Sequence, residues 1–187
     1  MVRLQKVNFH IDNIYNLDLD FLQSLERKYI LIDLDNTLDA YNVLVPAKRT
    51  YELLQEISSR FMIPIIMSNN KKKRVKPYCD HLRAKYYIYS SKKPSKKKIV
   101  NYLKSIGVEK GEEVLVIGDQ LLTDAKLARN LGAMMILTEP LTKKEHWSAK
   151  FTRLIDRPLR HHYAKLNMLG RAANRKSVSY THLRAHE

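Results

Sequence analysis

The chain lacks the features that mark secreted and membrane-spanning proteins. It contains a single cysteine, Cys79, so it cannot form an intramolecular disulfide, and a reduced, cytosolic setting is the simpler expectation. The first residues lack the long apolar stretch of a signal peptide. No run approaches the roughly 18 apolar residues of a membrane span. We therefore expect a cytoplasmic protein, either free or held peripherally at a membrane.

Acidic residues are scarce relative to basic ones. The 187 residues include 34 Lys and Arg against 19 Asp and Glu, which gives a formal net charge of +15. Such a charge attracts nucleic acid, anionic lipid headgroups or phosphorylated substrates, and does not choose among them. A basic surface that is simply solvated is the alternative. Hydrophobic residues make up 44% of the chain, which is enough for a folded core.

Short apolar runs alternate with amphipathic stretches along most of the chain. We predict buried strands at 29–34, 63–67, 86–89, 114–117 and 133–137. We predict helices between them, near 47–60, 71–84, 96–106 and 122–131. Unbroken apolar strands that alternate with helices indicate an α/β fold, with a central parallel sheet covered on both faces. In such a sheet the ligand site lies beyond the carboxyl ends of the strands.

The length fits one domain of moderate size. We place this domain at residues 1–160 and a basic tail at 161–187. In the tail, His161 and His162 are adjacent and would face different ways on a helix, so a surface role is favoured over a metal site. Residues 179–187 resemble translated sequencing-adapter read-through, so we expect this end to be non-native and exclude it from the fold prediction.

Two aspartates close the first predicted strand. Asp33 and Asp35 stand at i and i+2, so their side chains point to the same side of the strand. Carboxylates this close repel each other, and a magnesium ion, which prefers oxygen ligands, removes that penalty. Asp18 and Asp20 have the same spacing but lack the apolar strand before them and the threonine after them. We interpret that second pair as surface and the first pair as a candidate metal site.

The next two strand ends carry groups that suit a phosphate. Ser68, Asn69 and Asn70 follow the second predicted strand, where their hydroxyl and amide groups can hydrogen-bond a phosphoryl oxygen. Ordinary turn formation is the alternative for these residues. Lys93, which precedes a proline after the third strand, can hold a phosphate as a point charge. Most of the lysines around it must be solvated surface.

The fourth predicted strand ends at Gly118 and Asp119. Gly118 permits a tight exit, which places Asp119 to complete a metal site. Asp124 is a further candidate, either beside the metal or behind its ligands, and its alternative role is to cap the next helix. The residues at each strand end have an ordinary explanation when taken alone. No ordinary explanation accounts for the whole ordered set, in which an acid pair, a hydroxyl, a lysine and an acid stand at successive strand ends.

This ordered set resembles the motifs of the haloacid dehalogenase (HAD) superfamily. The matching residues are Asp33, Asp35 and Thr37 in the first motif, Ser68 in the second, Lys93 in the third, and Gly118, Asp119 and Asp124 in the fourth. Within that superfamily the chain is similar to the YqeG family of HAD IIIA-type phosphatases, through residues 32–38, 68–70, 116–124 and 151–153. That family in turn resembles the mitochondrial phosphatidylglycerophosphate phosphatases.

The resemblance implies a Rossmannoid three-layer sandwich and a magnesium-dependent phosphatase. Asp33 would attack phosphorus and form an aspartyl-phosphate, and Asp35 would act first as general acid and then as general base. Asp33, the backbone carbonyl of Asp35 and Asp119 would hold Mg²⁺, with Asp124 as a further metal candidate.

The remaining motif residues would bind the substrate. By the same resemblance, Ser68 and Lys93 would hold the equatorial phosphoryl oxygens and stabilise their charge. Thr37, Asn69 and Asn70 are assigned as further substrate contacts. Lys71–Arg74 follow the second motif directly and should lie near the mouth of the site, where they would draw in anionic lipid or RNA. A solvated helix face is the alternative for that cluster.

The gaps between the motifs leave no room for a cap domain. A helix and a strand use the residues from Asp33 to Ser68, and another helix and strand use those from Ser68 to Lys93. An uncapped site suits a bulky substrate, such as a lipid headgroup at a membrane, a protein or a nucleic acid end. The resemblance to the phosphatidylglycerophosphate phosphatases implies phosphatidylglycerophosphate as the substrate, with a nucleotide, a sugar phosphate or a phosphoprotein as alternatives. A basic HAD-fold protein that binds RNA or ribosomes, or a phosphotransferase, remains the alternative outside this activity.

Overall fold

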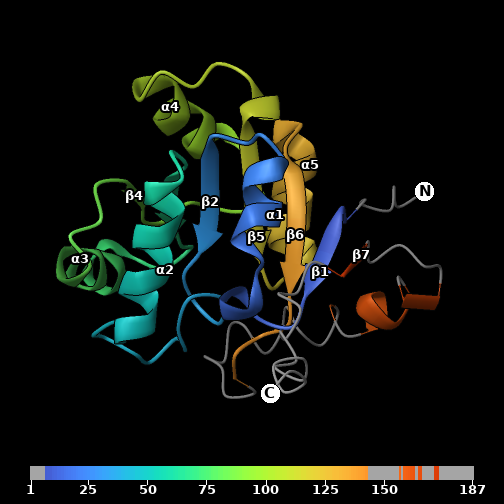
Figure 1. Cartoon of the computed structure of the whole chain (residues 1–187), viewed down its shortest axis with the longest axis horizontal. Helices are drawn as coiled ribbons and strands as arrows, with labels where there is room; N and C mark the ends of the chain where they lie inside the picture. The colour runs from blue at the N-terminus through green and yellow to red at the C-terminus, as the bar shows by residue number, and fades with distance from the viewer. Residues whose placement is uncertain (1–6, 143–155, 157, 163, 166–170, 173–187) are drawn as a thin grey trace, which may run out of the picture.

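A parallel β-sheet forms the centre of the protein (Figure 1). The computed structural model describes residues 7–142, 156, 158–162, 164–165 and 171–172. The strands are β1 (Phe9–Ile11), β2 (Tyr29–Asp33), β3 (Ile63–Met67), β4 (Tyr87–Ile88), β5 (Val114–Gly118), β6 (Met134–Thr138) and β7 (Arg171–Ala172). Their order is β4-β3-β2-β5-β6-β1-β7, and every neighbouring pair is parallel.

Helices cover both faces of this sheet. They are α1 (Leu19–Ser24), α2 (Lys48–Ser59), α3 (Lys72–His81), α4 (Lys97–Ser105) and α5 (Lys126–Leu131), with short 3₁₀ turns at Ile14–Asn16 and Gly111–Glu113 and a π-helical turn at Leu121–Ala125. Ile30 and Ile32 of β2 pack with α1, α2 and α3, whereas Tyr29 and Leu31 pack with α4 and α5. This alternation builds two cores, one on each side of the sheet, and the predicted three-layer α/β sandwich is confirmed.

All five strands predicted from the sequence are present. β4 is shorter than expected, and β1, β7 and α1 were not predicted, because elements of two to six residues carry little periodicity. Asp18 is the N-cap of α1, where its side chain accepts hydrogen bonds from the backbone N–H groups of Asp20 and Phe21. The second acidic pair thus has a structural role. The segments between Asp33 and Lys93 hold α2, β3, α3 and β4, which leaves no cap domain there.

The chain order places a switch point at the centre of the sheet. From β2 the chain adds β3 and then β4 on one side, and it returns to β5 on the other side of β2. The connections after β2 and β5 therefore diverge, and in sheets of this kind the ligand crevice lies beyond the carboxyl ends of these two strands. Asp33 is the last residue of β2, and Asp119 directly follows β5.

Part of the predicted tail pairs with the sheet. β7 lies beside β1, with Phe9 opposite Arg171 and His10 opposite Ala172. His161 and His162 are exposed, in agreement with the predicted surface role. Residues 151–153 and 179–187, which carried two of the sequence expectations, lie outside the described residues, and the boundary near residue 160 stays a prediction. Within the described part of the chain, no helix is both long and apolar enough to span a membrane.

The buried thiol of Cys79 provides a test of this packing. Cys79 lies on the inner face of α3, and burial, aided by the charge of Asp80, raises the pKa of its thiol to about 12. We expect the folded protein to be inert toward a thiol reagent at mildly alkaline pH, because the thiolate is the reactive form. The unfolded protein should react with one equivalent in an absorbance assay. Equal rates in the folded and unfolded states would contradict the packing of α3.

Candidate active site

Asp33 is carried into the centre of the sheet by a strand that is buried throughout. Every residue of β2 is buried, and the four residues before Asp33 are apolar or aromatic. β3 and β5 flank β2, so the Asp33 carboxylate lies between two neighbouring strands at the crevice. The hydroxyl of Thr37, also buried, is 3.5 Å from Asp33 Oδ2. The predicted first motif is therefore assembled around Asp33.

Lys93 links two of the predicted acidic residues. Its buried Nζ donates to Asp33 Oδ1 and to Asp124 Oδ1, the latter at 2.7 Å. Asn69 fixes the Lys93 backbone from both sides, because Oδ1 accepts the Lys93 N–H at 2.7 Å and Nδ2 donates to the Lys93 carbonyl at 3.1 Å. The Ser91 hydroxyl donates to the same Asn69 oxygen at 2.8 Å. Asn69 thus positions the loop that carries Ser91 and Lys93, here called the lysine loop. Its predicted contact with substrate stays a prediction.

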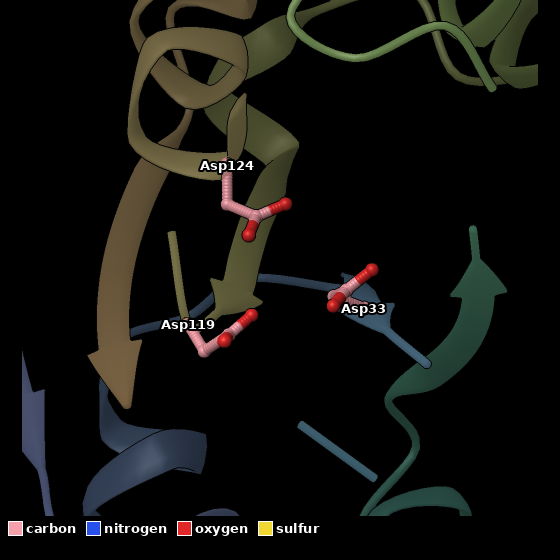
Figure 2. A group of neighbouring side chains, drawn as sticks. All are labelled: Asp33, Asp119 and Asp124. Carbon is pink, nitrogen blue, oxygen red and sulfur yellow. The ribbon is translucent and has the colours of Figure 1, made fainter. Parts of the chain in front are cut away.

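Three aspartates point toward one another at the crevice (Figure 2). Asp33, Asp119 and Asp124 each offer a carboxylate oxygen, and these oxygens lie within 4.8 Å of one another. All three side chains are buried. Carboxylate oxygens at this spacing form a donor set for a hard divalent cation such as magnesium or calcium.

Asp124 reaches the cluster through the space that Gly118 leaves. A Cβ on Gly118 would lie 2.4 Å from Asp124 Cγ, a distance at which the carboxylate would have to move. Asp124 belongs to the π-helical turn, a geometry that recurs at functional sites, and its Oδ2 also accepts the Gln120 N–H at 3.1 Å. The predicted alternative, a simple cap on the next helix, does not account for its contact with Lys93.

Negative charge dominates the buried cluster. Burial raises the pKa of Asp33 well above its ordinary value, Lys93 opposes that rise, and the nearby carboxylates of Asp124 and Asp119 add to it. Burial lowers the pKa of Lys93, but Asp124 and Asp33 outweigh it, so the ammonium stays protonated. The Lys93 ammonium contacts Asp33 and Asp124, and Asp119 brings a third carboxylate to the same group. A divalent cation would offset the repulsion among these carboxylates, so the residues fit a metal ion.

Asp35 lies beside this cluster in a separate hydrogen-bond network. Its Oδ2 accepts from Ser68 Oγ at 2.7 Å and from Asn70 Nδ2 at 2.9 Å, and its Oδ1 accepts from Arg74 Nη2 at 3.1 Å. Its carboxylate is not part of the three-aspartate group. Arg74 also donates from Nε to the Tyr41 carbonyl at 3.0 Å. The expected phosphate ligands Ser68 and Asn70 are thus adjacent to Asp35.

Two residues near the carboxyl end of the described chain, Asp156 and Arg160, support the loop at Asp119. The sequence did not predict this role. Arg160 Nη2 donates to the Asp119 carbonyl and, at 3.1 Å, to the Thr138 carbonyl. Asp156 is buried, accepts the backbone N–H groups that open the π-helical turn, at 2.9 and 3.2 Å, and binds Arg160 Nε at 3.2 Å. No motif or periodicity marks either residue. Arg74 was expected only as one member of a basic run, and nothing in that run distinguishes its inward contact with Asp35.

Comparisons with known proteins agree with this arrangement. The family model of mitochondrial PGP phosphatase matches residues 3–142. The probable phosphatase YqeG of Bacillus subtilis is 31% identical over 147 residues, which are 79% of this chain and 84% of that protein. A crystal structure of an uncharacterized protein from Listeria monocytogenes serotype 4b superposes with a TM-score of 0.51 at 16% identity, covering 64% of this chain and 84% of that chain. The last likeness supports the fold alone.

Replacing Gly118 tests the close approach of Asp124. In Gly118→Ala the new methyl group would push the Asp124 carboxylate away from Lys93, and we expect phosphatase activity to fall about a hundredfold while the fold persists. The measurements are the rate of phosphate release and circular dichroism. Gly107→Ala is the matched control, because no atom lies within 4 Å of the added group, although its φ of +85° makes the change cost about 1 kcal/mol of stability. Full activity in Gly118→Ala would show that Asp124 need not hold this position.

Proposed function

Because the chain belongs to the mitochondrial PGP phosphatase family, we propose that it hydrolyses a phosphate monoester at Asp33, with Mg²⁺ bound beside that carboxylate. It is a phosphatase of the HAD type. The observation that carries the proposal is the position of Asp33, at the end of a buried strand, bound to Lys93 and grouped with Asp119 and Asp124.

The proposed reaction has two steps at Asp33. In the first, a carboxylate oxygen of Asp33 attacks phosphorus, the ester P–O bond breaks, and Asp35 gives a proton to the leaving oxygen. In the second, Asp35 takes a proton from a water molecule as that water attacks phosphorus. The bond between phosphorus and Asp33 then breaks, and inorganic phosphate leaves. Ser68, 2.7 Å from Asp35, is placed beside the reacting group.

The metal would be held by Asp33, the backbone carbonyl of Asp35 and Asp119. When bound, Mg²⁺ would offset the repulsion between an anionic phosphate and the Asp33 carboxylate. Asp124 is held against Lys93, so its proposed role is to fix the ammonium and border the ion. Lys93 would then stabilise the charge of both Asp33 and the phosphoryl oxygens.

The proposed substrate is phosphatidylglycerophosphate. The family description supports this choice, and so does the absence of a cap between β2 and the lysine loop, because a phosphate on a large lipid can reach an open site. A nucleotide, a sugar phosphate or a phosphoprotein would use the same residues for the same chemistry.

Substitution of the nucleophile tests the first step. Asp33→Asn should reduce phosphate release below detection on phosphatidylglycerophosphate and on every other phosphate ester in a panel, because an amide does not attack phosphorus. Asp35→Asn should lower kcat by about 10²–10⁴-fold, the usual loss when a general acid is removed. Asp20→Asn is the control, since Asp20 has the matching position in the second acidic pair and is exposed. Metal-dependent turnover by Asp33→Asn would rule out this nucleophile.

Binding of Mg²⁺ can be measured without turnover. Added Mg²⁺ should raise Tm, because an ion that binds the folded state alone stabilises it, and chelation should abolish activity reversibly. Asp119→Asn should lose the Mg²⁺-induced shift, because it removes one of the three carboxylates of the group. Asp35→Asn should keep that shift, because the proposed ligand there is the backbone carbonyl. An unchanged shift in Asp119→Asn would remove this residue from the metal site.

A further inference from the structure

Two large apolar side chains are exposed side by side in the loop between β2 and α2. Leu44 is 64% exposed and Val45 is 60% exposed. Within the described residues the other large hydrophobic side chain this open is Phe61, which is 89% exposed. Phe61 comes just before β3, at the end of the sheet where the parallel strands begin, whereas Leu44 and Val45 follow the carboxyl end of β2. An adjacent pair of exposed aliphatic residues is costly in water and marks a contact surface.

The loop that presents this pair is anchored on both sides. Val43 packs against the core, and its N–H donates to the Ala40 carbonyl at 3.0 Å. Pro46 is buried, and the Tyr41 carbonyl accepts a hydrogen bond from Arg74. The exposure of Leu44 and Val45 is therefore a feature of a folded loop rather than of a loose one.

Three exposed lysines stand at the beginning of α3. Lys71 is the N-cap, and Lys72 and Lys73 are the first two helical residues. Among the described residues none of the three forms an ion pair, although Lys72 lies 5.9 Å from the centre of the Tyr89 ring. Positive charge at a helix N-terminus opposes the helix dipole, so these lysines weaken the helix that they start. An anion bound beside these lysines would offset their charge.

Both features are linked to Asp35 through hydrogen bonds of neighbouring residues. Asn70 and Arg74, which flank the three lysines in the sequence, each donate to the Asp35 carboxylate. Arg74 also binds the Tyr41 carbonyl of the loop that carries Leu44. A surface that binds this loop and the start of α3 would therefore lie against the opening beside Asp35.

We propose that Leu44, Val45 and Lys71–Lys73 form a docking face for an anionic lipid bilayer. This inference rests on the proposed function and extends it to a substrate phosphate that is carried on a lipid. The two aliphatic side chains would enter the boundary between headgroups and acyl chains, and the lysines would lie against lipid phosphates. Bound in this way, the bilayer covers the uncapped site and delivers the phosphate beside Asp35.

The exposed side chains favour lipid over nucleic acid. Proteins that bind single-stranded RNA use aromatic rings on which bases stack. Leu44 and Val45 are aliphatic and give no such platform, whereas they match the hydrocarbon boundary of a bilayer.

Vesicle binding tests the docking face apart from the chemistry. The full-length protein should sediment with vesicles of phosphatidylcholine and phosphatidylglycerol, and much less with phosphatidylcholine alone. Leu44→Asp/Val45→Asp should lose this binding. Lys71→Gln/Lys72→Gln/Lys73→Gln should weaken it about a hundredfold at low salt. Both variants should hydrolyse a water-soluble phosphate ester at the parental rate, because none of these residues belongs to the catalytic site.

Residues just before the amino ends of β2, β3 and β4 supply matched controls. Phe61→Asp removes a more exposed apolar side chain, and Lys28→Gln/Arg83→Gln/Lys85→Gln removes three exposed basic ones, so both should bind vesicles like the parent. Equal vesicle binding by Leu44→Asp/Val45→Asp and the parent would overturn the docking face. So would a parent that binds single-stranded RNA and no vesicles. Asp33→Asn should still bind vesicles. Vesicle binding therefore tests the docking face even if the proposed chemistry at Asp33 is wrong.

Discussion

The buried ammonium of Lys93 is the contact on which the arrangement of the site depends. Without it, Asp33 and Asp124 would lose the ammonium that they share, and three carboxylates this close together take up protons or move apart. Lys93 can occupy this position because Asn69 holds its backbone on two sides. Asp124 can meet it because Gly118 has no side chain. The end of β2 and the π-helical turn after β5 thus meet at the charge of Lys93.

Under the proposed function, the site divides into a buried part that holds charge and a more open part that moves a proton. Asp33, Asp119 and Asp124 are buried and fixed around Lys93, which suits binding of an ion and a phosphate. Asp35 is more open and is bound to side chains from the loop after β3 and from α3. Two carboxylates separated by a single residue therefore have different surroundings, and that difference is what a nucleophile and an acid–base group require.

The sequence predicted those parts of the molecule that local pattern controls. β2, β3, β5 and β6 are unbroken apolar runs, and once they are known to be parallel, Asp33, Ser68 and Asp119 must meet at one edge. β1 has three residues and pairs with β6 from the far end of the chain, so its position is set by tertiary packing. Contacts between distant residues could not be predicted in this way. The Asn69 side chain binds the backbone of Lys93, and no residue next to Asn69 in the sequence indicates that partner.

Asp156 and Arg160, which bind the turn after β5 and the Asp119 carbonyl, indicate how long a fragment must be to keep the site intact. The match to the family model ends at residue 142 and contains every motif residue of the site. The guanidinium that binds the Asp119 carbonyl, and the carboxylate that holds the following turn, come later. A polypeptide that ended at residue 142 would keep every motif residue and lose the hydrogen bonds that Asp156 and Arg160 make to the Asp119 carbonyl and the following turn. The minimal unit that holds this site in place is therefore longer than the stretch that the family model matches.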